Sequence, residues 1–385
     1  MLYHLIEWLE GMGMNIPGAG LMNYLSFRAM AAAVISMIIS FIAGKKIIAL
    51  LQKKQIGETI RDLGLEGQMQ KKGTPTMGGV IIILALVGSA LLVCRLDSIY
   101  TLLLLLTTLW CGAIGFADDY IKVFKKKKEG MSERCKLILQ FGLGLAIALT
   151  VCISPAIPTD RLVTTIPFVK THEFDYSWLS IFRGQIGVYC SWGIYMLMII
   201  IVILACSNGT NLTDGMDGLA AGTSAIVGVA LGVMAWLSGD ALDAAYLNIM
   251  HIPGTGEVAV YMAAFVGALI GFLWYNTFPA QVFMGDTGSL MIGGVIGVSA
   301  VLIRKELLLP VLCGIFFMES LSVIIQRGWF KYTRKKYGEG RRVFLMAPLH
   351  HHYQKQGIPE PRIVTRFWII GIILAVSTLA LLKIR

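Results

Sequence analysis

Long apolar segments separated by short polar segments make up most of the chain. A helix that crosses the hydrocarbon core of a bilayer needs about 20 apolar residues, with a range of roughly 17–25. Ten segments meet this requirement, so the pattern predicts ten transmembrane helices, the first of them free to continue past Lys45. The segments are Phe27–Ala43, Gly78–Cys94, Ile99–Ala117, Leu137–Ile153, Val188–Cys206, Leu219–Leu237, Ala259–Tyr275, Phe283–Ile303, Leu307–Ile325 and Ile363–Leu382.

The composition agrees with a protein embedded in lipid. Hydrophobic residues make up 56% of the chain and charged residues 15%, whereas soluble domains average about 45–50% and about 25%. We therefore expect an all-α polytopic membrane protein with a single integral membrane domain over residues 1–385. The acidic Glu7 and Glu10, with no Lys or Arg before Arg28, argue against a signal peptide. The cysteines form no CxxC pair, so they are interpreted as small buried side chains.

Basic residues are distributed unevenly among the polar segments. Residues 44–75, 118–136 and 326–366 follow the first, third and ninth apolar segments and hold 24 of the 33 Lys and Arg residues. Because Lys and Arg are enriched in cytoplasmic loops, these segments are expected in the cytoplasm and both termini on the outer side. The run Lys125–Lys128 is explained by this topology signal and by contact with lipid headgroups. Acidic residues do little for orientation, so the pair Asp118–Asp119 needs another explanation.

Five polar clusters fall on the face predicted to be cytoplasmic. Unrelated loops would be divided between the two faces, and the outward loops show no comparable density of polar groups. Ionisable groups close to a bilayer are costly unless they are paired or solvated, which makes them functional candidates. We expect the clusters to meet in one pocket. They are KKGTPTMGG at 71–79, the pair Asp118–Asp119, SNGTNLTDGMDG at 207–218, WYNTFPAQVFMGDTGS at 274–289 and MAPLHHHYQKQG at 346–357.

The residue types in these clusters fit magnesium and phosphate. Carboxylates are hard oxygen ligands, and Mg²⁺ prefers one or two of them together with water and phosphate oxygens. Lysine and histidine side chains donate hydrogen bonds to phosphate. We expect phosphoryl transfer at the membrane face, between a nucleotide-linked donor from water and a phosphate-bearing lipid. The carboxylates are those of Asp118, Asp119, Asp214, Asp217 and Asp286, and the histidines are His350, His351 and His352.

Each cluster also has a simpler interpretation. Asp286 stands where a residue would cap the N-terminus of the eighth helix. Residues 74–76 fit a plain helix start, and the three histidines fit a solvated loop; a zinc site is disfavoured because three adjacent residues rarely converge on one ion. Asn208 and Asn211 match the glycosylation pattern, which their predicted cytoplasmic position discounts. Glu319, in the ninth apolar segment, has no predicted role.

The motifs together closely resemble the phospho-N-acetylmuramoyl-pentapeptide-transferase family, within the polyprenyl-phosphate N-acetylhexosamine 1-phosphate transferase superfamily. The resemblance rests on KKGTPTMGG, GFADDYIKV, NLTDGMDGLA, VFMGDTGSL and PLHHHYQKQG in this order. It covers nearly the whole chain, including ten spans with both termini outside, and is weakest in the outward loops at about 154–187 and 239–257. The triple histidine after Ala-Pro-Leu favours the muramoyl-pentapeptide branch over the N-acetylglucosamine branch.

This resemblance implies a Mg²⁺-dependent transferase of the bacterial cytoplasmic (inner) membrane, with periplasmic termini and an active site facing the cytoplasm. The implied reaction moves phospho-MurNAc-pentapeptide from UDP-MurNAc-pentapeptide to undecaprenyl phosphate, giving lipid I and UMP for peptidoglycan synthesis. A homodimer in the lipid bilayer is also implied, and no nucleic-acid partner is expected. Direct attack by the lipid phosphate is favoured over a covalent intermediate, because a metal-positioned phosphate is already a nucleophile.

The resemblance also assigns roles to matching residues. Asp286 is expected to bind Mg²⁺ and, with Asp118, Asp119 and His351, to take part in catalysis. The remaining assignments concern the substrates. Phosphate contacts are expected from Lys71, Lys72, Lys122, Lys126 and Lys136, nucleotide and diphosphate contacts from Asn208, Asn211, Asp214, Asp217 and Asn276, uracil stacking from Phe283, and contacts to the diphosphate-sugar from His350, His351 and His352.

Two other functions are compatible with parts of the pattern. A UDP-N-acetylglucosamine:undecaprenyl-phosphate GlcNAc-1-phosphate transferase would use the same clusters and differ in its donor sugar. A transporter of phosphorylated solutes would place its polar groups near the bilayer midplane on broken helices. The polar clusters of this chain lie instead at the ends of the predicted helices, on one side.

Overall fold

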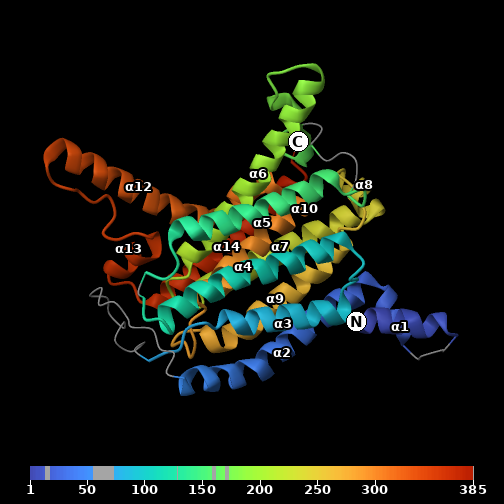
Figure 1. Cartoon of the computed structure of the whole chain (residues 1–385), viewed down its shortest axis with the longest axis horizontal. Coiled ribbons are helices and arrows are strands. Elements are labelled where there is room, and N and C mark those ends of the chain that lie inside the picture. The colour runs from blue at the N-terminus through green and yellow to red at the C-terminus, as the bar shows by residue number, and fades with distance from the viewer. Residues whose placement is uncertain (14–17, 55–72, 128, 158–161, 170–172, 385) are drawn as a thin grey trace.

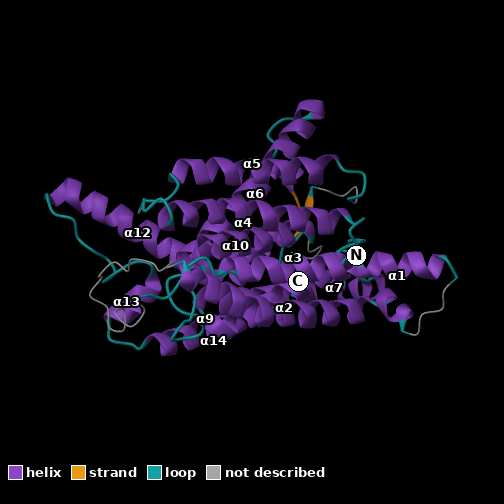
Figure 2. Ribbon diagram, turned by 60° about the horizontal axis from the view of Figure 1, so that its bottom comes forward, coloured by secondary structure: helices purple, strands orange, loops and turns teal. Residues whose placement is uncertain are grey.

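The structure is a computed structural model that describes residues 1–385 except 14–17, 55–72, 128, 158–161, 170–172 and 385. Long helices lie side by side in a bundle, with one short antiparallel hairpin (Figures 1 and 2). The helices are α1 (Leu2–Gly11), α2 (Leu25–Lys53), α3 (Gly79–Val93), α4 (Ile99–Val123), α5 (Glu133–Ile153), α6 (Gly184–Thr213), α7 (Leu219–Gly239), α8 (Ala241–Leu247), α9 (Gly256–Asn276), α10 (Gly285–Leu302), α11 (Leu309–Leu312), α12 (Gly314–Tyr337), α13 (Leu349–Lys355) and α14 (Glu360–Leu381). The strands are β1 (Val163–Thr165) and β2 (Glu173–Asp175), and the 3-10 turns are η1 (Ala19–Asn23), η3 (Tyr176–Leu179) and η4 (Glu306–Leu308).

Each of the ten segments predicted to cross the membrane falls on helical structure. Among the described residues, eight helices are long and apolar enough to cross a bilayer, and a ninth counts if one bent pair is a single span. The helix α3 is shorter, with 15 residues. The predicted fold class, an all-α polytopic membrane protein, is confirmed, and α2 continues past Lys45 to Lys53. The short helices α1, α8 and α13 and the hairpin were not predicted, because none is a long apolar segment.

The ninth predicted segment, Leu307–Ile325, is not one straight helix, which corrects the prediction. It is divided among η4, α11 and α12, and the parts on either side of Cys313 meet at 77°. Pro310, in the first turn of α11, has no backbone N–H to donate. Cys313 then leaves helical geometry, with φ −93° and ψ 26°. Beyond this break, α12 extends away from the bundle (Figure 1).

Helix α10 lies at the centre of the bundle. Every residue from Thr287 to Leu302 is buried, and α10 packs against α3, α4, α6 and α7. A helix that is apolar on all sides is stable in lipid as well as inside a protein, so the burial of α10 reflects its packing against these helices. The start of α10 carries Asp286, so the packing of this one helix decides where that carboxylate lies.

Glycines allow α3 and α4 to approach the start of α10 very closely. A Cβ atom added at Gly79 would lie 2.1 Å from the backbone N of Gly288, and one added at Gly115 would lie 2.1 Å from the backbone O of Asp286. Real Cβ atoms do not approach that closely, so any larger residue would push the helices apart. Gly115 is one turn before Asp118 and Asp119, so this contact sets the separation of the three carboxylates.

Separate contacts stabilise the far end of the bundle. Arg28 at the start of α2 forms a buried ion pair with Glu257 at the start of α9, with 2.6 Å between Nη1 and Oε1. The β1–β2 hairpin is fixed beyond the end of α10, where Lys305 Nζ donates a hydrogen bond to Thr165 Oγ1 at 2.6 Å. These contacts hold the bundle at the end opposite to Asp286.

Replacing Gly115 by Ala is expected to lower the free energy of unfolding by about 1–3 kcal/mol, the usual cost of overpacking a tight contact. The midpoint of thermal unfolding of the purified protein in detergent measures this effect. The matched control is Gly142→Ala in α5, where an added Cβ meets no atom within 4 Å. A Gly115→Ala protein as stable as the Gly142→Ala protein would show that the α4–α10 contact is not tight.

Candidate functional site

Three carboxylates from two helices meet at one end of the bundle. Asp118 and Asp119 lie near the end of α4, and Asp286 is in the first turn of α10. One ligand oxygen from each lies within 4.8 Å of the others. Adjacent residues on a helix point about 100° apart, and the two aspartates of α4 accordingly have different partners.

Asp119 caps the N-terminus of α10. Its carboxylate accepts hydrogen bonds from the backbone N–H of Asp286 at 3.1 Å and from the backbone N–H of Thr287 at 2.9 Å. It also accepts one from Thr287 Oγ1 at 2.6 Å. The first N–H groups of a helix have no partner inside the helix, and a carboxylate there also interacts favourably with the helix dipole. Asp119 is buried, and both of its oxygens accept hydrogen bonds in this cap.

The interpretation of Asp286 as a helix cap is therefore wrong. The residue that precedes α10 is Met284, which makes no side-chain cap hydrogen bond. Asp286 lies inside the first turn, and its carboxylate accepts hydrogen bonds from Lys122, Lys136 and Asn211. A residue from another helix performs the capping, and local sequence rules cannot reveal that.

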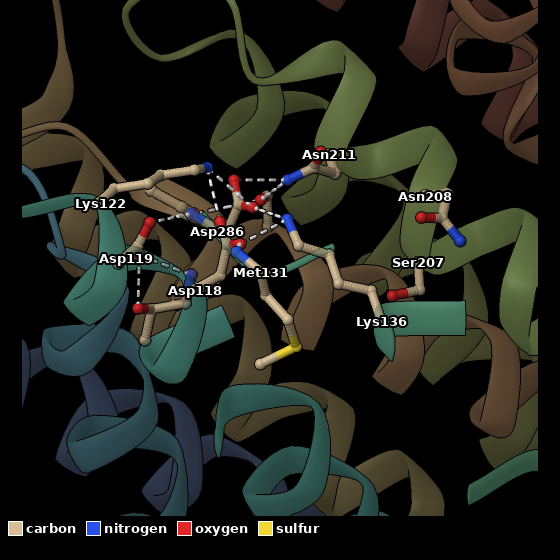
Figure 3. Close-up of polar contacts among 12 residues, drawn as sticks. Asp118, Asp119, Lys122, Met131, Lys136, Ser207, Asn208, Asn211 and Asp286 are labelled. Carbon is tan, nitrogen blue, oxygen red and sulfur yellow. Dashed lines mark hydrogen bonds and ion pairs between the residues drawn. The ribbon is translucent and has the colours of Figure 1, made fainter. Parts of the chain in front are cut away.

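Asp286 is instead surrounded by donors from three other helices (Figure 3). Lys122 Nζ of α4 lies 3.1 Å from Oδ2, and Lys136 Nζ of α5 lies 2.7 Å from the same atom. Asn211 of α6 donates from Nδ2 to Oδ1 at 3.0 Å and also to Ser289 Oγ at 2.9 Å.

The same two lysines bind Asp118. Lys122 Nζ lies 2.6 Å from Asp118 Oδ2, and Lys136 Nζ lies 3.0 Å from Oδ1. Oδ1 also accepts a hydrogen bond from the backbone N–H of Met131 at 2.7 Å, which ties the segment between α4 and α5 to the site. Both ammonium groups thus bridge Asp118 and Asp286.

The donor set fits a hard divalent cation. It offers carboxylate oxygens and no sulfur or imidazole, which is the preference of such ions. Three carboxylates against two ammonium groups leave one formal negative charge. The Asp118 side chain is fully buried, whereas those of Asp286, Lys136 and Lys122 are 16%, 18% and 35% exposed. The lysines therefore lie on the open side, where they can turn towards another anion.

A hydrogen-bonded layer supports this cluster. Asn208, three residues before Asn211, donates from Nδ2 to Gln140 Oε1 at 3.0 Å. Gln140 Nε2 donates to Ser207 Oγ at 3.0 Å, and Ser207 Oγ donates to the Leu290 backbone O at 3.0 Å. Asn208 was predicted to contact the nucleotide, and its described contacts are with α5 and its own helix. This network joins α5, α6 and α10 about one turn below Lys136 and Asn211.

The predicted residues of the α6–α7 loop hold three chain segments together. Asp217 is buried; its Oδ2 accepts from the backbone N–H of Ala280 at 3.0 Å, and its backbone N–H donates to Glu360 Oε1 at 2.8 Å. Asn276 accepts at Oδ1 from the Gly218 N–H at 3.0 Å and donates to the Val282 backbone O at 2.9 Å. The neighbouring Asp214 is half-buried.

Phe283 and the start of α3 are joined through their backbones. Phe283 N–H donates to Pro75 O at 2.8 Å, and Gly78 N–H donates to Phe283 O at 2.8 Å. The Phe283 side chain is half-buried. The described part of the 71–79 motif therefore lies beside the start of α10, where it was expected, while the predicted Lys71 and Lys72 are outside the described residues.

The three histidines form part of α13 and have different surroundings. His350 is buried, with Nδ1 3.2 Å from Glu319 Oε2 of α12. His351 and His352 are half-buried; His351 Nδ1 lies 3.1 Å from Gln354 Oε1, and His352 Nδ1 accepts from the Leu345 N–H at 3.1 Å. These contacts place the histidines in a folded helix and not in a solvated loop.

The sequence did not predict the positions of several side chains relative to the site. Lys126 was predicted to bind phosphate, but it is exposed and has φ +51°, outside the Asp118–Asp286 cluster. Gln140, Glu319 and Glu360 support the site and were not predicted to do so. The only signal for Glu319 was that it is an acid within an apolar segment, which is costly unless the acid is paired.

Comparisons with known proteins agree with these motifs. A model described as "Glycosyl transferase family 4" matches residues 101–304, and "Phospho-N-acetylmuramoyl-pentapeptide-transferase signature 1" matches residues 71–83. Curated proteins named phospho-N-acetylmuramoyl-pentapeptide-transferase are similar over the whole of both chains. Among them are proteins from Parabacteroides distasonis, 53% identical, Flavobacterium psychrophilum, 52% identical, and Porphyromonas gingivalis, 49% identical, each with 100% of both chains covered.

Replacing Asp286 and Asp119 separately by Asn is expected to have different effects. Asp286→Asn removes a charged ligand, so binding of Mn²⁺, used as a spectroscopic probe, is expected to weaken about tenfold or more. Asp119→Asn leaves N–H groups of α10 without full acceptors, so we expect a loss of about 1–3 kcal/mol in the free energy of unfolding. Electron paramagnetic resonance measures free Mn²⁺, and thermal unfolding measures stability.

The control for both replacements is Asp243→Asn in α8, far from the cluster, which is expected to change neither quantity. Unchanged Mn²⁺ binding by the Asp286→Asn protein would remove Asp286 from the cation site. Unchanged stability of the Asp119→Asn protein would contradict the cap.

Proposed function

The chain belongs to the phospho-N-acetylmuramoyl-pentapeptide-transferase family, and from this premise we propose that it transfers phospho-MurNAc-pentapeptide from UDP-MurNAc-pentapeptide to undecaprenyl phosphate. The products are lipid I and UMP. The observation that carries the proposal is the cluster of Asp118, Asp119 and Asp286 with Lys122 and Lys136 at one end of a membrane bundle. Such a site is open to a nucleotide from water and to a phosphate on a lipid.

In the proposed reaction an oxygen of the lipid phosphate attacks the phosphorus atom that carries the sugar. A new phosphorus–oxygen bond forms to the lipid, and the bond between that phosphorus and the oxygen of UMP breaks. Both reactants are anions, so their approach requires neutralisation before any other effect. Lys122 and Lys136 supply two positive charges on the exposed side of the cluster, where they can exchange a carboxylate partner for a phosphate oxygen.

We propose Mg²⁺ as the cofactor, with Asp286 as its ligand and Asp118 within reach of it. When bound, Mg²⁺ would neutralise diphosphate charge and stabilise the leaving UMP. Asp119 is committed to the backbone of α10, and we propose that it acts by fixing Asp286. Asn211, which donates to Asp286 Oδ1, orients that carboxylate.

The donor is proposed to bind between the cluster and α13. Phe283 would stack on uracil, and Asn208, Asp214, Asp217 and Asn276 would shape the nucleotide pocket. His350, His351 and His352 would bind the diphosphate-sugar, and Lys71, Lys72 and Lys126 would contact phosphate from the surrounding segments. The proposal follows the motif positions, and the hydrogen bonds of Asp217 and Asn276 support it by holding the pocket walls together.

The proposed setting is the bacterial cytoplasmic membrane. We propose ten membrane crossings within one domain, both termini in the periplasm, and a homodimer. The uneven distribution of basic residues supports this orientation. It places the cluster on the cytoplasmic side, where a nucleotide-linked donor is available.

Purified protein is expected to form lipid I from UDP-MurNAc-pentapeptide and undecaprenyl phosphate in the presence of Mg²⁺. Chelation of the metal should abolish turnover, and the Asp286→Asn protein should lose nearly all activity. Product formation is measured by chromatography of the extracted lipid. The same assay with UDP-N-acetylglucosamine separates the two donor classes: transfer from this donor alone would establish the alternative transferase.

Cys135 is exposed at the start of α5 beside Lys136, so the interpretation of the cysteines as buried side chains is wrong for this residue. Cys135 is expected to lie in the cytoplasm. A variant that keeps Cys135 as its only cysteine should react with a membrane-impermeant maleimide only after cells are permeabilised. The matched control carries Leu242→Cys in a protein that has no other cysteine. Its exposed position in α8 should react in intact cells. Reaction of Cys135 in intact cells, followed on gels, would reverse the proposed orientation.

A further inference from the structure

Glu319 is a charged side chain buried within an otherwise apolar part of α12. Its exposed fraction is 0%, as is that of His350. Burying an ion costs several kcal/mol unless a partner and hydrogen bonds compensate. His350 of α13 is the one titratable partner of Glu319 among the described residues, with 3.2 Å between Nδ1 and Oε2.

The Glu319 carboxylate also reaches the backbone of α13. His350 N–H donates to Oε1 at 3.2 Å and lies 3.4 Å from Oε2. Pro348, which precedes α13, makes no side-chain cap hydrogen bond. Glu319 thus holds both the ring and the backbone of the first histidine in the motif. Figure 1 shows α13 on the same side of the bundle as the projecting part of α12.

The other side of the His350 ring packs against the α6–α7 loop. A Cβ atom added at Gly215 would lie 2.2 Å from His350 Nε2, so the ring occupies the space that a side chain would fill. Gly215 is next to Asp214, whose backbone N–H donates to Asn211 O at 3.3 Å. Asn211 in turn donates to Asp286 at 3.0 Å. Contacts therefore run from Glu319 through His350 and this loop to the carboxylate cluster.

We propose that Glu319 is a positioning residue of the transferase site. Its carboxylate accepts the backbone N–H of His350 and lies 3.2 Å from Nδ1 of the ring, and it thereby fixes α13 against the α6–α7 loop, which presents His351 to the diphosphate-sugar. The expected effect of Glu319 on turnover rests on the proposed function. An apolar side chain at position 319 would fit the apolar surroundings of α12 better. The contacts with His350 therefore account for the carboxylate at this position.

The test compares Glu319→Gln with the unmodified protein. Gln keeps an acceptor for the His350 backbone N–H, but it removes the negative charge beside Nδ1, and its amide can donate to that nitrogen. We expect kcat to fall roughly tenfold or more, the scale observed when a carboxylate that orients a histidine is removed from a metal site. Calorimetric titration with UDP-MurNAc-pentapeptide should give an unchanged stoichiometry, which shows that the folded fraction is constant.

The protonation of the His350 ring is measured by nuclear magnetic resonance of protein labelled with ¹⁵N-histidine. The chain has six histidines, and His350→Gln identifies the signals of His350 by their loss. Nδ1 of His350 is expected to be protonated in the unmodified protein and unprotonated in the Glu319→Gln protein. Glu319→Asp, which keeps a carboxylate, should recover part of both the signal and kcat.

Glu339→Gln, an exposed acid beyond α12, is the matched control and should change neither kcat nor the His350 signals. Normal kcat with a changed Nδ1 signal, or reduced kcat with an unchanged signal, would each overturn the positioning role. If the unmodified protein transfers neither donor sugar, the proposed function fails. The Nδ1 signal then still decides whether Glu319 holds His350, so the two failures are distinguishable.

Discussion

The structure depends on buried carboxylates that accept backbone N–H groups from neighbouring segments. Asp119 of α4 caps α10, Glu319 of α12 reaches the first turn of α13, and Glu360 of α14 accepts from Asp217 in the α6–α7 loop. Water cannot satisfy N–H groups that are buried at the membrane face, so an acceptor must come from the protein. Because each acceptor belongs to another helix, these bonds fix the helices relative to one another as well as completing their ends.

This arrangement explains how several acids remain close together. Asp119 is compensated by the N-terminus of α10, while Asp118 and Asp286 share two lysines. The lysines lie on the open side, so the cluster can bind an anion without the helices moving. Only the ammonium groups would have to change partners, because the backbone that positions them is already fixed.

The sequence predicted the all-helical membrane fold well, because long apolar segments have few other solutions in lipid. It also selected Asp118, Asp119 and Asp286 together with Lys122 and Lys136, which the structure brings together. It could not separate Asp119 from Asp118, because their difference lies in partners on α10. The break at Cys313 was missed because hydropathy is continuous across it.

The sequence by itself determined which segments are helices and which residue types gather at their ends, because hydropathy and charge are properties of the chain. Only the tertiary structure decided what each polar side chain does. Asp286 faces lysines rather than its own helix end, Gln140 joins α5 to α6, and Glu319 holds a histidine. Hydrogen bonds and ion pairs act over about 3 Å, so the roles of these groups depend on packing between segments far apart in the chain.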